Sequence, residues 1–591
     1  MTLYEEAFEW PRLTYGAALE QLAARLPERE LFVFHHVESP ESDWRAARRA
    51  YTAADFLTAV NRLACGLLAL GVAAGERVAL WLANVPEAAI AQFAIAKIGA
   101  VVVPINTRFK AGELEYVLRQ SEAATLITME RFLDTEYEAI IRALCPEANI
   151  CPPGRLRSHR FPDLKRLITL GPGAPGMFAF SHVLALGAEP CWERALRQRE
   201  ADVRPDDVVL LQYTSGSTAF PKGVMLAHDQ TLRNAFIMAG RAGFDENDRV
   251  LSAMPMFHIG GSVCALLGAV TRGYILHMMT KFDAGETLRL FEEERITAYI
   301  GIETMFLMLR DHPDFSRRDR SSLRKGWAAG SPALLQMVAD EIGIRHVCSV
   351  YGLSEASPNV CITDWRDARE KRLRTNGRPH PGVEVEIRDP ETGERLAPGQ
   401  AGEICVRGYN VMKGYYRMPE ETACAIDPDG WLHTGDRGML TEEGYLIFLG
   451  RLKDVLRVGG ENVSALEVEN FLLTHPKVIA AAVIGVPDPQ WGEVPAAFLQ
   501  LKEGEHLTEE EVIRYCRQQL APFKVPHYVR FVREFPMTGS GKIHKSRLRE
   551  SFEREMRRGI EAPLLATREG GQESPSDVGG HYPECSLDKC R

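Results

Sequence analysis

The sequence predicts an α/β protein with a large N-terminal domain of helix-covered parallel sheets and a small α+β domain towards the C-terminus. Three observations lead to this prediction. The chain has 591 residues, more than a single hydrophobic core usually contains. In the first half, helical periods alternate with short β-branched runs, a pattern typical of parallel sheets covered by helices. After Gly382, runs of alternating polarity are separated by glycine-rich turns, which indicates antiparallel strands.

The first half supplies the elements of the parallel sheets. Residues 56–70 and 87–98 have a helical period. Short apolar or β-branched runs predict buried strands at residues 77–83, 100–104, 125–128, 166–169 and 208–211.

The pattern of predicted secondary structure changes in the second half. Strands predicted at residues 383–387, 403–406 and 444–448 indicate a small β-barrel-like section. The following unit has a helix at 466–474, a strand at 478–486 and a helix at 508–520 that opens with Thr-Glu-Glu-Glu. The predicted division is an N-terminal domain at residues 1–452, a mobile C-terminal domain at 453–555 and a disordered tail at 556–591.

Composition limits the class of protein. Apolar residues make up 45% and charged residues 25%, and the formal net charge of −10 does not favour a nucleic-acid partner. The twelve cysteines form no CxxC pair, so neither disulfides nor metal ligation by cysteine is expected. No basic segment followed by an apolar one opens the chain, and polar residues and Pro104 interrupt the most apolar stretch, residues 88–105. We therefore expect a cytoplasmic protein without a transmembrane segment.

The most informative stretch is Tyr213-Thr-Ser-Gly-Ser-Thr-Ala-Phe-Pro-Lys-Gly-Val224. A strand that ends in such a loop presents backbone N–H groups, hydroxyls and one ammonium to a common space, which suits a polyphosphate. The spacing is not that of a P-loop, where Ser or Thr follows Gly-Lys. A polar surface turn with a solvated lysine is the alternative interpretation. The predicted phosphate-binding residues are Thr214, Ser215, Gly216, Ser217, Thr218 and Lys222.

This segment closely resembles the phosphate loop of the adenylate-forming enzymes, which include acyl-CoA synthetases, aryl-CoA ligases, luciferases and peptide-synthetase adenylation domains. Ala219 stands where that family has a glycine, and it can serve there if its φ is negative. Further segments resemble the same family, in the same order, over almost the whole chain.

Three of these segments bear on the nucleotide. Ala329-Gly-Ser-Pro-Ala333 resembles the family's turn beside the nucleotide and the acyl group. In Tyr351-Gly-Leu-Ser-Glu355, the resemblance implies that the aromatic ring stacks on adenine and that the glutamate ligates Mg²⁺. In Trp431-Leu-His-Thr-Gly-Asp436, it implies that the aspartate accepts both ribose hydroxyls. The ATP-binding residues implied beyond the phosphate loop are Gly330, Ser331, Pro332, Tyr351, Gly352, Leu353, Ser354, Glu355, Asp436, Arg451 and Lys542, with Glu355 and Thr218 as metal ligands.

Catalysis is assigned by the same resemblance. Lys542, in Pro536-Met-Thr-Gly-Ser-Gly-Lys-Ile543, corresponds to a lysine whose ammonium can stabilise both the α-phosphate and the attacking carboxylate. Lys222 and Glu355 act on the phosphates. His258 precedes an apolar helix predicted at 262–270 and is implied to line the acyl tunnel.

The resemblance also implies a hinge at Lys453, after which the small domain rotates for thioester formation. Arg457, Gly459 and Gly460 would then border the CoA channel. The acyl pocket is assigned to His258, Gly260 and Gly330, with Ser262, Glu303, Met305, Phe306 and residues 357–360 as further candidates.

The implied reaction converts a carboxylic acid, ATP and CoA into acyl-CoA, AMP and diphosphate through an acyl-adenylate, with Mg²⁺ as cofactor. The candidate pocket residues are mostly apolar or small and include no arginine, which favours a medium- or long-chain fatty acid. The alternatives are an aryl or alicyclic acid–CoA ligase, an acyl-AMP ligase that delivers to a carrier protein, a luciferase-like oxidative decarboxylation, and a non-catalytic nucleotide-binding scaffold. A homodimer is the assembly to test.

Overall fold

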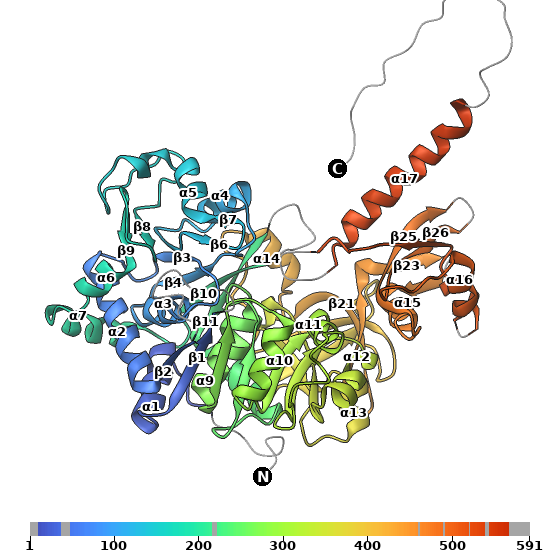
Figure 1. The fold of residues 1–591 in the computed structure, drawn as a ribbon, viewed down its shortest axis with the longest axis horizontal. Helices are drawn as coiled ribbons and strands as arrows, with labels where there is room; N and C mark the ends of the chain where they lie inside the picture. The colour runs from blue at the N-terminus through green and yellow to red at the C-terminus, as the bar shows by residue number, and fades with distance from the viewer. Residues whose placement is uncertain are drawn as a thin grey trace, which may run out of the picture.

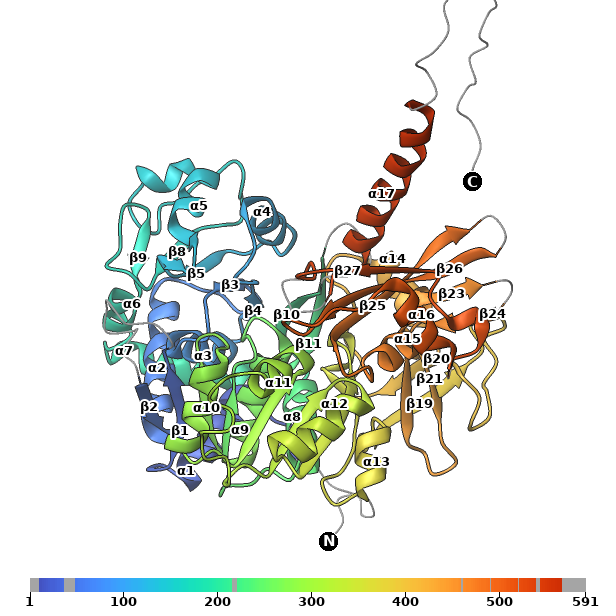
Figure 2. The same ribbon diagram turned by 45° about the vertical axis from the view of Figure 1, so that its right-hand side comes forward.

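A computed structural model of the chain describes residues 10–36, 48–214, 221–458, 461–488, 491–518, 520–537 and 543–565. Two mainly parallel sheets and their helices form the large N-terminal part, and an antiparallel sheet and a small α+β unit follow (Figure 1). The small unit, coloured orange to red, lies beside the antiparallel sheet (Figure 2). The predicted α/β class with a small C-terminal unit is confirmed.

The first parallel sheet has seven strands in the order β11-β10-β4-β3-β5-β8-β9. All neighbours are parallel except β10 and β11, which form an antiparallel pair. Its strands are β3 (Arg77–Trp81), β4 (Val101–Pro104), β5 (Thr125–Thr128), β8 (Arg166–Thr169), β9 (Met177–Ala179), β10 (Val208–Thr214) and β11 (Lys222–Ala227).

The second sheet has nine strands in the order β18-β17-β16-β15-β14-β12-β13-β1-β2. The six strands from β16 to β1 are parallel, and antiparallel strands complete both edges. The strands are β1 (Glu30–His35), β2 (Arg48–Thr52), β12 (Arg249–Ser252), β13 (Ile275–Met279), β14 (Ala298–Ile302), β15 (Lys325–Ala329), β16 (His346–Gly352), β17 (Asn359–Ile362) and β18 (Arg378–Pro379).

Helices pack on and between the two sheets around one large core that extends from Tyr15 to Leu446. Side-chain caps mark several helix starts, as when the Thr52 hydroxyl accepts from the Asp55 amide at 3.0 Å. The helices are α1 (Tyr15–Arg25), α2 (Ala53–Ala69), α3 (Pro86–Lys97), α4 (Ala111–Gln120), α5 (Tyr137–Leu144), α6 (Phe180–Leu186), α7 (Cys191–Asp202), α8 (His228–Arg241), α9 (Leu266–Arg272), α10 (Ala284–Glu293), α11 (Glu303–Arg310), α12 (Pro332–Met337), α13 (Arg369–Arg374) and α14 (Pro419–Ala425), and β6 (Arg131–Phe132) with β7 (Thr135–Glu136) forms a short hairpin.

Helix α3 explains the most apolar stretch of the sequence. All of its residues are buried, and β4 follows it directly. Its polar side chains are paired rather than solvated: Lys97 Nζ lies 2.6 Å from Glu20 and 2.5 Å from Glu200. The expected buried helix followed by a strand is therefore confirmed, and no described helix is long and apolar enough to cross a membrane.

The antiparallel section is a four-stranded sheet in the order β19 (Val383–Arg388), β20 (Gly402–Gly408), β21 (Leu432–Leu440) and β22 (Leu446–Arg451). Among the described strands, β19 and β22 do not pair to close the sheet. The predicted β-barrel-like section thus consists of four antiparallel strands, each paired with its neighbour along the chain.

The small unit has its own cores, which begin at Leu456 and Ala482. Its five-stranded sheet has the path β24-β23-β26-β25, with β27 parallel to β26. The elements are β23 (Val455–Val458), β24 (Glu461–Ser464), α15 (Ala465–Leu472), β25 (Val478–Asp488), β26 (Gly492–Leu501), α16 (Glu509–Arg517), β27 (Tyr528–Phe531) and α17 (Lys545–Leu565). The hydrophobic cores change between Leu446 and Leu456, and the exact domain boundary at residue 453 stays a prediction.

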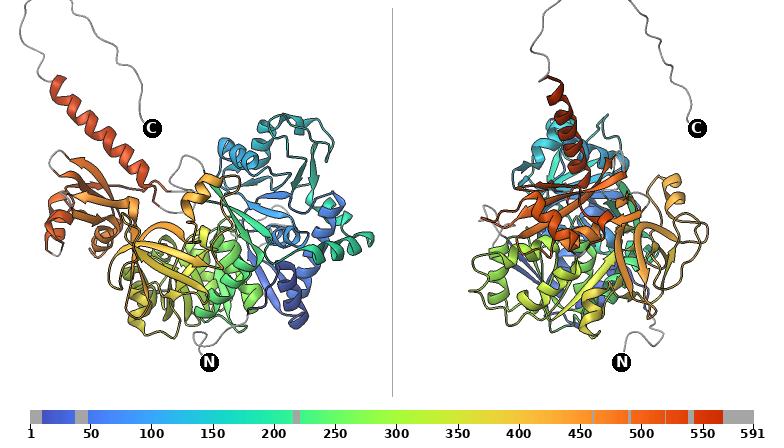
Figure 3. Two further views of the ribbon diagram at one scale, coloured as in Figure 1. Left: turned by 180° about the vertical axis from the view of Figure 1, so that it is seen from behind. Right: turned by 90° about the vertical axis from the view of Figure 1, so that its right-hand side faces the viewer.

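Two local predictions need correction. The sequence predicts a disordered tail from residue 556, but residues 556–565 continue α17, which projects from the small unit (Figure 3). A helix already formed from Lys545 extends at little cost, so Gly559 and Pro563 do not end it where the sequence suggested. The helix predicted at 262–270 begins earlier, with a π-helical turn at Gly260–Ala265 that leads into α9.

Candidate active site

The base of the predicted phosphate loop is an antiparallel hairpin. Thr214 at the end of β10 pairs directly with Lys222 at the start of β11. The hydroxyl of Tyr116 donates to the carbonyl oxygen of Pro221 at 3.0 Å and so fixes the approach to β11. Ser215, Gly216, Ser217 and Thr218 lie outside the described residues. The two ends of the loop are thus held together at the edge of the seven-stranded sheet.

Tyr415 connects Lys222 with Glu355. The Lys222 ammonium lies 4.9 Å from the centroid of the Tyr415 ring, and the Tyr415 hydroxyl donates to Glu355 Oε1 at 2.9 Å. Burial, followed by the nearby Glu355 carboxylate, raises the pKa of Tyr415, so the phenol stays protonated and acts as a donor. A cation and a carboxylate from different sheets therefore meet at one aromatic side chain.

The backbone explains how Tyr415 reaches this position. The segment that contains it pairs with β11 through a bridge between Val224 and Tyr415, and the Tyr416 amide donates to the Gly223 carbonyl at 2.8 Å. The Met412 amide donates to the Glu355 carbonyl at 2.8 Å. The segment thus acts as an additional edge strand beside the phosphate loop.

Tyr351, Asp436 and Arg451 form a second cluster. The Tyr351 hydroxyl donates to Asp436 Oδ2 at 2.9 Å, and Arg451 Nε lies 3.7 Å from Asp436 Oδ1. Asp436 and Arg451 are also opposite each other on β21 and β22. Burial, followed by the charge of Asp436, raises the pKa of Tyr351. One face of the Tyr351 ring is already occupied by Phe448, whose centroid lies 5.4 Å away.

A tight turn joins the two clusters, because Tyr351 and Glu355 are four residues apart at the end of β16. Gly352 is exposed, and a Cβ atom there would lie 2.0 Å from the Pro358 carbonyl oxygen, so no larger residue fits. The Leu353 amide donates to the same carbonyl at 2.8 Å, and Ser354 begins a single 3-10 turn, Ser354–Ala356. The chain therefore reverses within the predicted nucleotide motif.

The Gly330-Ser331-Pro332 turn connects β15 with α12. Ser331 is buried and its hydroxyl accepts from the Leu334 amide at 3.1 Å, which makes it the N-cap of α12, while Pro332 occupies the first helical turn. Gly330 is exposed beside it. Part of this motif is thus explained by helix capping alone.

The segment around His258 follows β12 of the nine-stranded sheet and is held by two residues of the seven-stranded sheet. Asn84, which follows β3, donates to the Met254 carbonyl at 3.0 Å and accepts from the Met256 amide at 2.7 Å. Gln212 on β10 donates to the Phe257 carbonyl at 2.9 Å. His258 itself is half-buried, and its Nδ1 accepts from the Gly260 amide at 3.2 Å.

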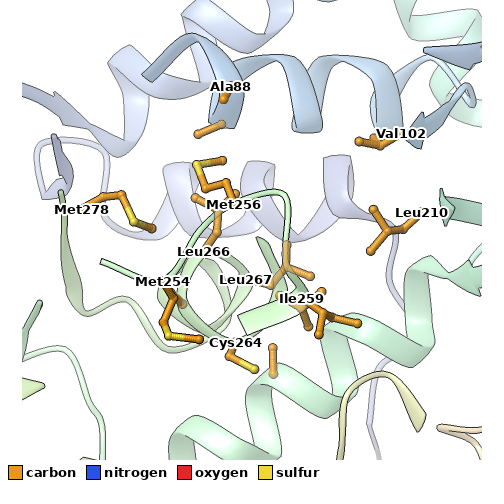
Figure 4. Packing of buried hydrophobic residues seen from close by; sticks show 14 of the residues in the cluster. Ala88, Val102, Leu210, Met254, Met256, Ile259, Cys264, Leu266, Leu267 and Met278 are labelled. Carbon is orange, nitrogen blue, oxygen red and sulfur yellow. The ribbon is translucent and has the colours of Figure 1, made fainter. Parts of the chain in front are cut away.

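The two glycines after His258 are buried among apolar side chains. Met254, Met256, Ile259 and Cys264 lie close together in this cluster (Figure 4). A Cβ atom on Gly261 would lie 2.4 Å from the Pro255 carbonyl oxygen, so that glycine is required by backbone packing. A Cβ atom on Gly260 would instead meet the Met254 methyl group at 2.6 Å, the end of a flexible side chain.

Glu303 begins α11 and faces the small unit. Burial, followed by the Glu469 carboxylate, raises the pKa of Glu303 to about 7. Glu469 lies on α15, where it accepts from the Val483 amide at 2.6 Å and pairs with Lys545 at 2.7 Å. The charge of Glu469 in the small unit therefore acts on Glu303 in the large part. Met305 and Phe306, the other candidates on α11, are buried.

The remaining predicted residues belong to the small unit. Lys453 lies in a 3-10 turn, Leu452–Asp454, between β22 and β23, and Arg457 lies on β23. The Ser464 hydroxyl donates to the Leu449 carbonyl at 2.7 Å and links the two sides of this connection. Gly459, Gly460 and Lys542 lie outside the described residues.

Sequence reasoning missed Tyr415, Phe448 and Glu469. Tyr415 belongs to Met412-Lys-Gly-Tyr-Tyr416, where a glycine before two aromatic residues was an available signal for an edge strand. The sequence predicts only a strand at Phe448, and Glu469 is one of several acidic residues on its helix. Each acts through a partner far away in sequence, which no local pattern reveals.

Comparison with known proteins shows which family shares this architecture. The AMP-binding enzyme family matches residues 19–416, and the AMP-binding enzyme C-terminal domain matches residues 467–542. The chain is 40% identical to YngI of Bacillus subtilis over 541 residues, which are 91% of this chain and 96% of that protein. It is 34% identical to the mitochondrial medium-chain acyl-CoA ligase ACSF2 of Homo sapiens over 551 residues, which are 92% and 88% of the two chains.

A solved structure gives the same result. The anthranilate CoA ligase AuaEII in complex with anthranoyl-AMP matches with a TM-score of 0.80 at 26% identity, covering 93% of this chain and 99% of that one. The chain therefore belongs to the AMP-binding enzyme family.

Proposed function

We propose that the chain is an acyl-CoA synthetase, which joins a carboxylic acid to CoA at the expense of ATP and releases AMP and diphosphate. The observation that carries this proposal is the turn between Tyr351 and Glu355. At one end, Tyr351 contacts Asp436, the expected ribose ligand. At the other, Glu355 contacts Tyr415, which also lies beside Lys222 at the base of the phosphate loop. Candidate groups for ribose and phosphates thus meet on one turn, as one nucleotide requires.

In the proposed site, the phosphates are held by the loop after β10. Lys222 and the hydroxyls of Thr214, Ser215, Ser217 and Thr218 neutralise and orient them, while Gly216 lets the backbone approach. Asp436 accepts the ribose hydroxyls, and Arg451 on the neighbouring strand adds a positive charge.

The chemistry at Glu355 fits Mg²⁺. Its carboxylate supplies the hard oxygen donor that this ion prefers, and the Tyr415 hydroxyl fixes the orientation of the carboxylate. Glu355 and Thr218 are the proposed ligands. Mg²⁺, when bound, would offset the charge on the phosphate oxygens during displacement of diphosphate.

Lys542 is proposed to stabilise the charge that develops on the α-phosphate and on the attacking carboxylate. The small domain then rotates about Lys453, and Arg457, Gly459 and Gly460 border the channel for CoA. The acyl-adenylate is attacked by the CoA thiol, the carbonyl–oxygen bond to AMP breaks, and AMP leaves with the bonding electrons. The thiol proton passes to solvent.

A medium- or long-chain fatty acid is the proposed substrate. The residues around His258 and Gly260 are apolar, and several are methionines, whose flexible side chains can adapt to a methylene chain. The relative ACSF2 is named a medium-chain acyl-CoA ligase, which supports the same substrate class. Cytoplasmic location and a homodimer stay predictions.

The deciding experiment measures AMP formation with CoA across a panel of straight-chain, aromatic and alicyclic acids. Saturable, CoA-dependent AMP release with straight-chain acids is the expected result. Activity confined to an aromatic acid such as anthranilate would retain the ligase chemistry but reject the fatty-acid assignment. Acid-dependent ATP–pyrophosphate exchange without thioester formation would indicate delivery to a carrier protein. No exchange with any acid would favour a nucleotide-binding scaffold.

A further inference from the structure

Three side chains with different donor atoms converge on one face of the antiparallel sheet, where Cys405 is buried and Glu403 and His433 are partly exposed. His433 Nδ1 lies 2.9 Å from Glu403 Oε2 and 3.6 Å from the Cys405 sulfur, and the sulfur lies 4.0 Å from the same carboxylate oxygen. The arrangement follows from strand register, because Cys405 on β20 is directly opposite His433 on β21 and Glu403 is two residues from Cys405. All three ligand atoms lie within 4.8 Å of one another.

The 3.6 Å between the Cys405 sulfur and His433 Nδ1 is that of a tetrahedral metal site, and the other two separations are close to it. With metal–nitrogen and metal–oxygen bonds of about 2.0–2.2 Å and a metal–sulfur bond of about 2.3 Å, tetrahedral ligand atoms lie roughly 3.3–3.6 Å apart. On metal binding, His433 Nδ1 and Glu403 Oε2, now 2.9 Å apart, would separate by about half an ångström, and the sulfur and Oε2, now 4.0 Å apart, would approach by about the same amount. His433 is 32% exposed, so a fourth position can be filled by water.

A second layer of contacts orients the histidine and the carboxylate. Asp427 Oδ2 lies 3.6 Å from His433 Nε2, on the side of the ring opposite the cluster. The Gly435 amide donates to Glu403 Oε1 at 3.0 Å, which leaves Oε2 directed towards His433. A carboxylate behind a metal-binding imidazole is the usual support for such a ligand.

Of the described carboxylates around the cluster, only Glu403 is not paired with Arg388. Glu386 on β19 is opposite Cys405 on β20, and Asp427 lies behind His433. Arg388 pairs with both of these carboxylates, at 3.2 and 3.0 Å, and so compensates their charge, while Glu403 contacts His433 and the Gly435 amide. The carboxylate nearest the thiol therefore faces the histidine and a backbone amide.

We propose that Glu403, Cys405 and His433 form a binding site for a thiophilic divalent cation, for which Zn²⁺ is the best chemical match. A mixed sulfur, nitrogen and oxygen set favours Zn²⁺ over Mg²⁺, which requires oxygen ligands in octahedral geometry. On binding, the Cys405 thiol loses its proton to solvent and a metal–sulfur bond forms, with no change of oxidation state.

A second cluster, His35 with His277 and Glu294, is a poorer candidate. Its carboxylate already pairs with Arg48 at 2.8 Å and with Arg249 at 2.5 Å. Two guanidinium groups on the only anionic ligand would oppose a divalent cation.

Hydrogen bonds connect the proposed metal site to Asp436, the expected ribose ligand. His433 precedes Thr434, whose hydroxyl donates to the Ile404 carbonyl at 2.7 Å and accepts from the Asp436 amide at 3.1 Å. A metal that bridges Glu403 and His433 would fix both strands at the start of this turn. If the proposed function holds, the metal therefore preorganises Asp436 and strengthens nucleotide binding.

The test is a titration of the untagged full-length protein with Zn²⁺, and with Co²⁺ as a spectroscopic probe, without ATP or Mg²⁺. One ion per chain and a sulfur-to-cobalt charge-transfer band in the near ultraviolet are expected. Cys405→Ala should remove that band and lower Zn²⁺ affinity at this site at least tenfold. Glu403→Gln, which keeps an acceptor for the Gly435 amide, should weaken binding without altering thermal unfolding of the metal-free protein.

Two matched controls separate this site from other thiols. Cys424→Ala, at an exposed cysteine on α14, and the double variant Cys585→Ala/Cys590→Ala should retain binding and the charge-transfer band. Unchanged Zn²⁺ affinity and an unchanged cobalt spectrum in Cys405→Ala would overturn the proposal. Loss of Zn²⁺ binding or of the charge-transfer band in either control variant would also overturn it.

The coupling to the nucleotide is measured separately, as AMP affinity in the absence of Mg²⁺. Saturating Zn²⁺ should raise it roughly 2- to 5-fold in the wild type by preorganisation and leave it unchanged in Cys405→Ala. A bound metal with no effect on AMP would refute the coupling. No AMP binding with or without metal would instead count against the proposed function, because the cobalt spectrum does not depend on nucleotide.

Discussion

Tyr351 and Asp436 are joined by a hydrogen bond of 2.9 Å between the end of β16 and the middle of β21. The contact connects the nine-stranded sheet to the antiparallel sheet, although the two residues are 85 positions apart. Because Phe448 stacks on one face of the Tyr351 ring, only the other face can receive a base. The aspartate, the aromatic ring and the antiparallel sheet are thus positioned by one another.

The first prediction concerns Asp436. Replacement by alanine should raise the KM for ATP about 10- to 100-fold, since a charged acceptor of ribose hydroxyls is worth roughly 1.5–3 kcal/mol. Initial rates across ATP concentrations provide the measurement. Tyr351→Phe is the matched control: it removes a donor to Asp436 but keeps the acceptor and the ring, so its effect should be smaller. Equal KM values in wild type and Asp436→Ala would reject the ribose assignment.

The second prediction concerns Glu355. Glu355→Gln should increase the Mg²⁺ concentration needed for half-maximal pyrophosphate exchange, because an amide is a weaker ligand than a carboxylate. Tyr415→Phe should cause a smaller shift in the same direction, since the carboxylate loses the hydroxyl that orients it but keeps its charge. Identical Mg²⁺ titration curves for wild type and Glu355→Gln would remove this residue from the metal site.

The sequence predicted the parts of the fold that have a local signature. Strands at 125–128 and 166–169 match β5 and β8 because each is a short buried run. Sequence patterns did not reveal β15, Lys325–Ala329, which contains no β-branched residue and is stabilised by strands on both sides. The strand orders of both large sheets depend on pairings between distant segments, which a local pattern does not contain.

The residues of the candidate site also divide into those with a local sequence signature and those defined by contacts between distant segments. Motif residues could be assigned by resemblance, since each lies in a short recognisable segment. Tyr415 and Glu469 could not, because Tyr415 acts through a hydrogen bond to the distant Glu355 and Glu469 acts through its charge on Glu303 in the other unit. Ser331 shows the opposite case, in which a predicted ligand residue also has a local structural role as a helix cap.

The third prediction concerns Lys542. Lys542→Ala should abolish acyl-adenylate formation and leave CoA transfer from supplied acyl-adenylate largely intact, because only the first step develops charge on the α-phosphate. Pyrophosphate exchange measures the first step, and thioester formation from synthetic acyl-adenylate measures the second. A similar loss in both would contradict the assignment.

Lys453→Pro provides the reciprocal control for that experiment. Proline fixes φ at the proposed pivot, so this variant should retain adenylation and lose CoA transfer. Wild-type rates of CoA transfer in Lys453→Pro would show that the rotation takes place elsewhere.

The fourth prediction concerns pH and Glu303, whose pKa is raised from 4.5 to about 7 by burial and then by Glu469. The folded protein binds more protons at Glu303 than the unfolded chain between these values. Its stabilising contribution is therefore complete below pH 4.5 and is lost as pH rises towards about 7.

Thermal unfolding measured from about pH 5 to about pH 8 tests this linkage. Over that range the melting temperature of the wild type should fall relative to that of Glu303→Gln, which cannot ionise. Glu442→Gln, at an exposed glutamate, is the control and should follow the wild type. Parallel curves for wild type and Glu303→Gln would show that the carboxyl is already ionised throughout the range.

The fifth prediction concerns acyl-chain length and Gly260. Each buried methylene should add roughly 0.8 kcal/mol of binding until the pocket ends, so kcat/KM should rise with chain length and then fall sharply. Gly260→Leu should move the fall to shorter acids. The added side chain would meet the Met254 methyl group, and Met254 would have to move towards the neighbouring apolar cluster.

Met254→Ala distinguishes this effect from general damage to the enzyme. Truncating the Met254 side chain enlarges the space beside Gly260. The chain length with the highest kcat/KM should therefore increase in Met254→Ala. In Gly260→Leu/Met254→Ala it should return part of the way to the wild-type length. Acetyl-CoA formation, which needs no extended pocket, reports whether the chemistry remains intact in all three variants. A length profile that keeps the same maximum in Gly260→Leu would place the acyl chain away from this glycine.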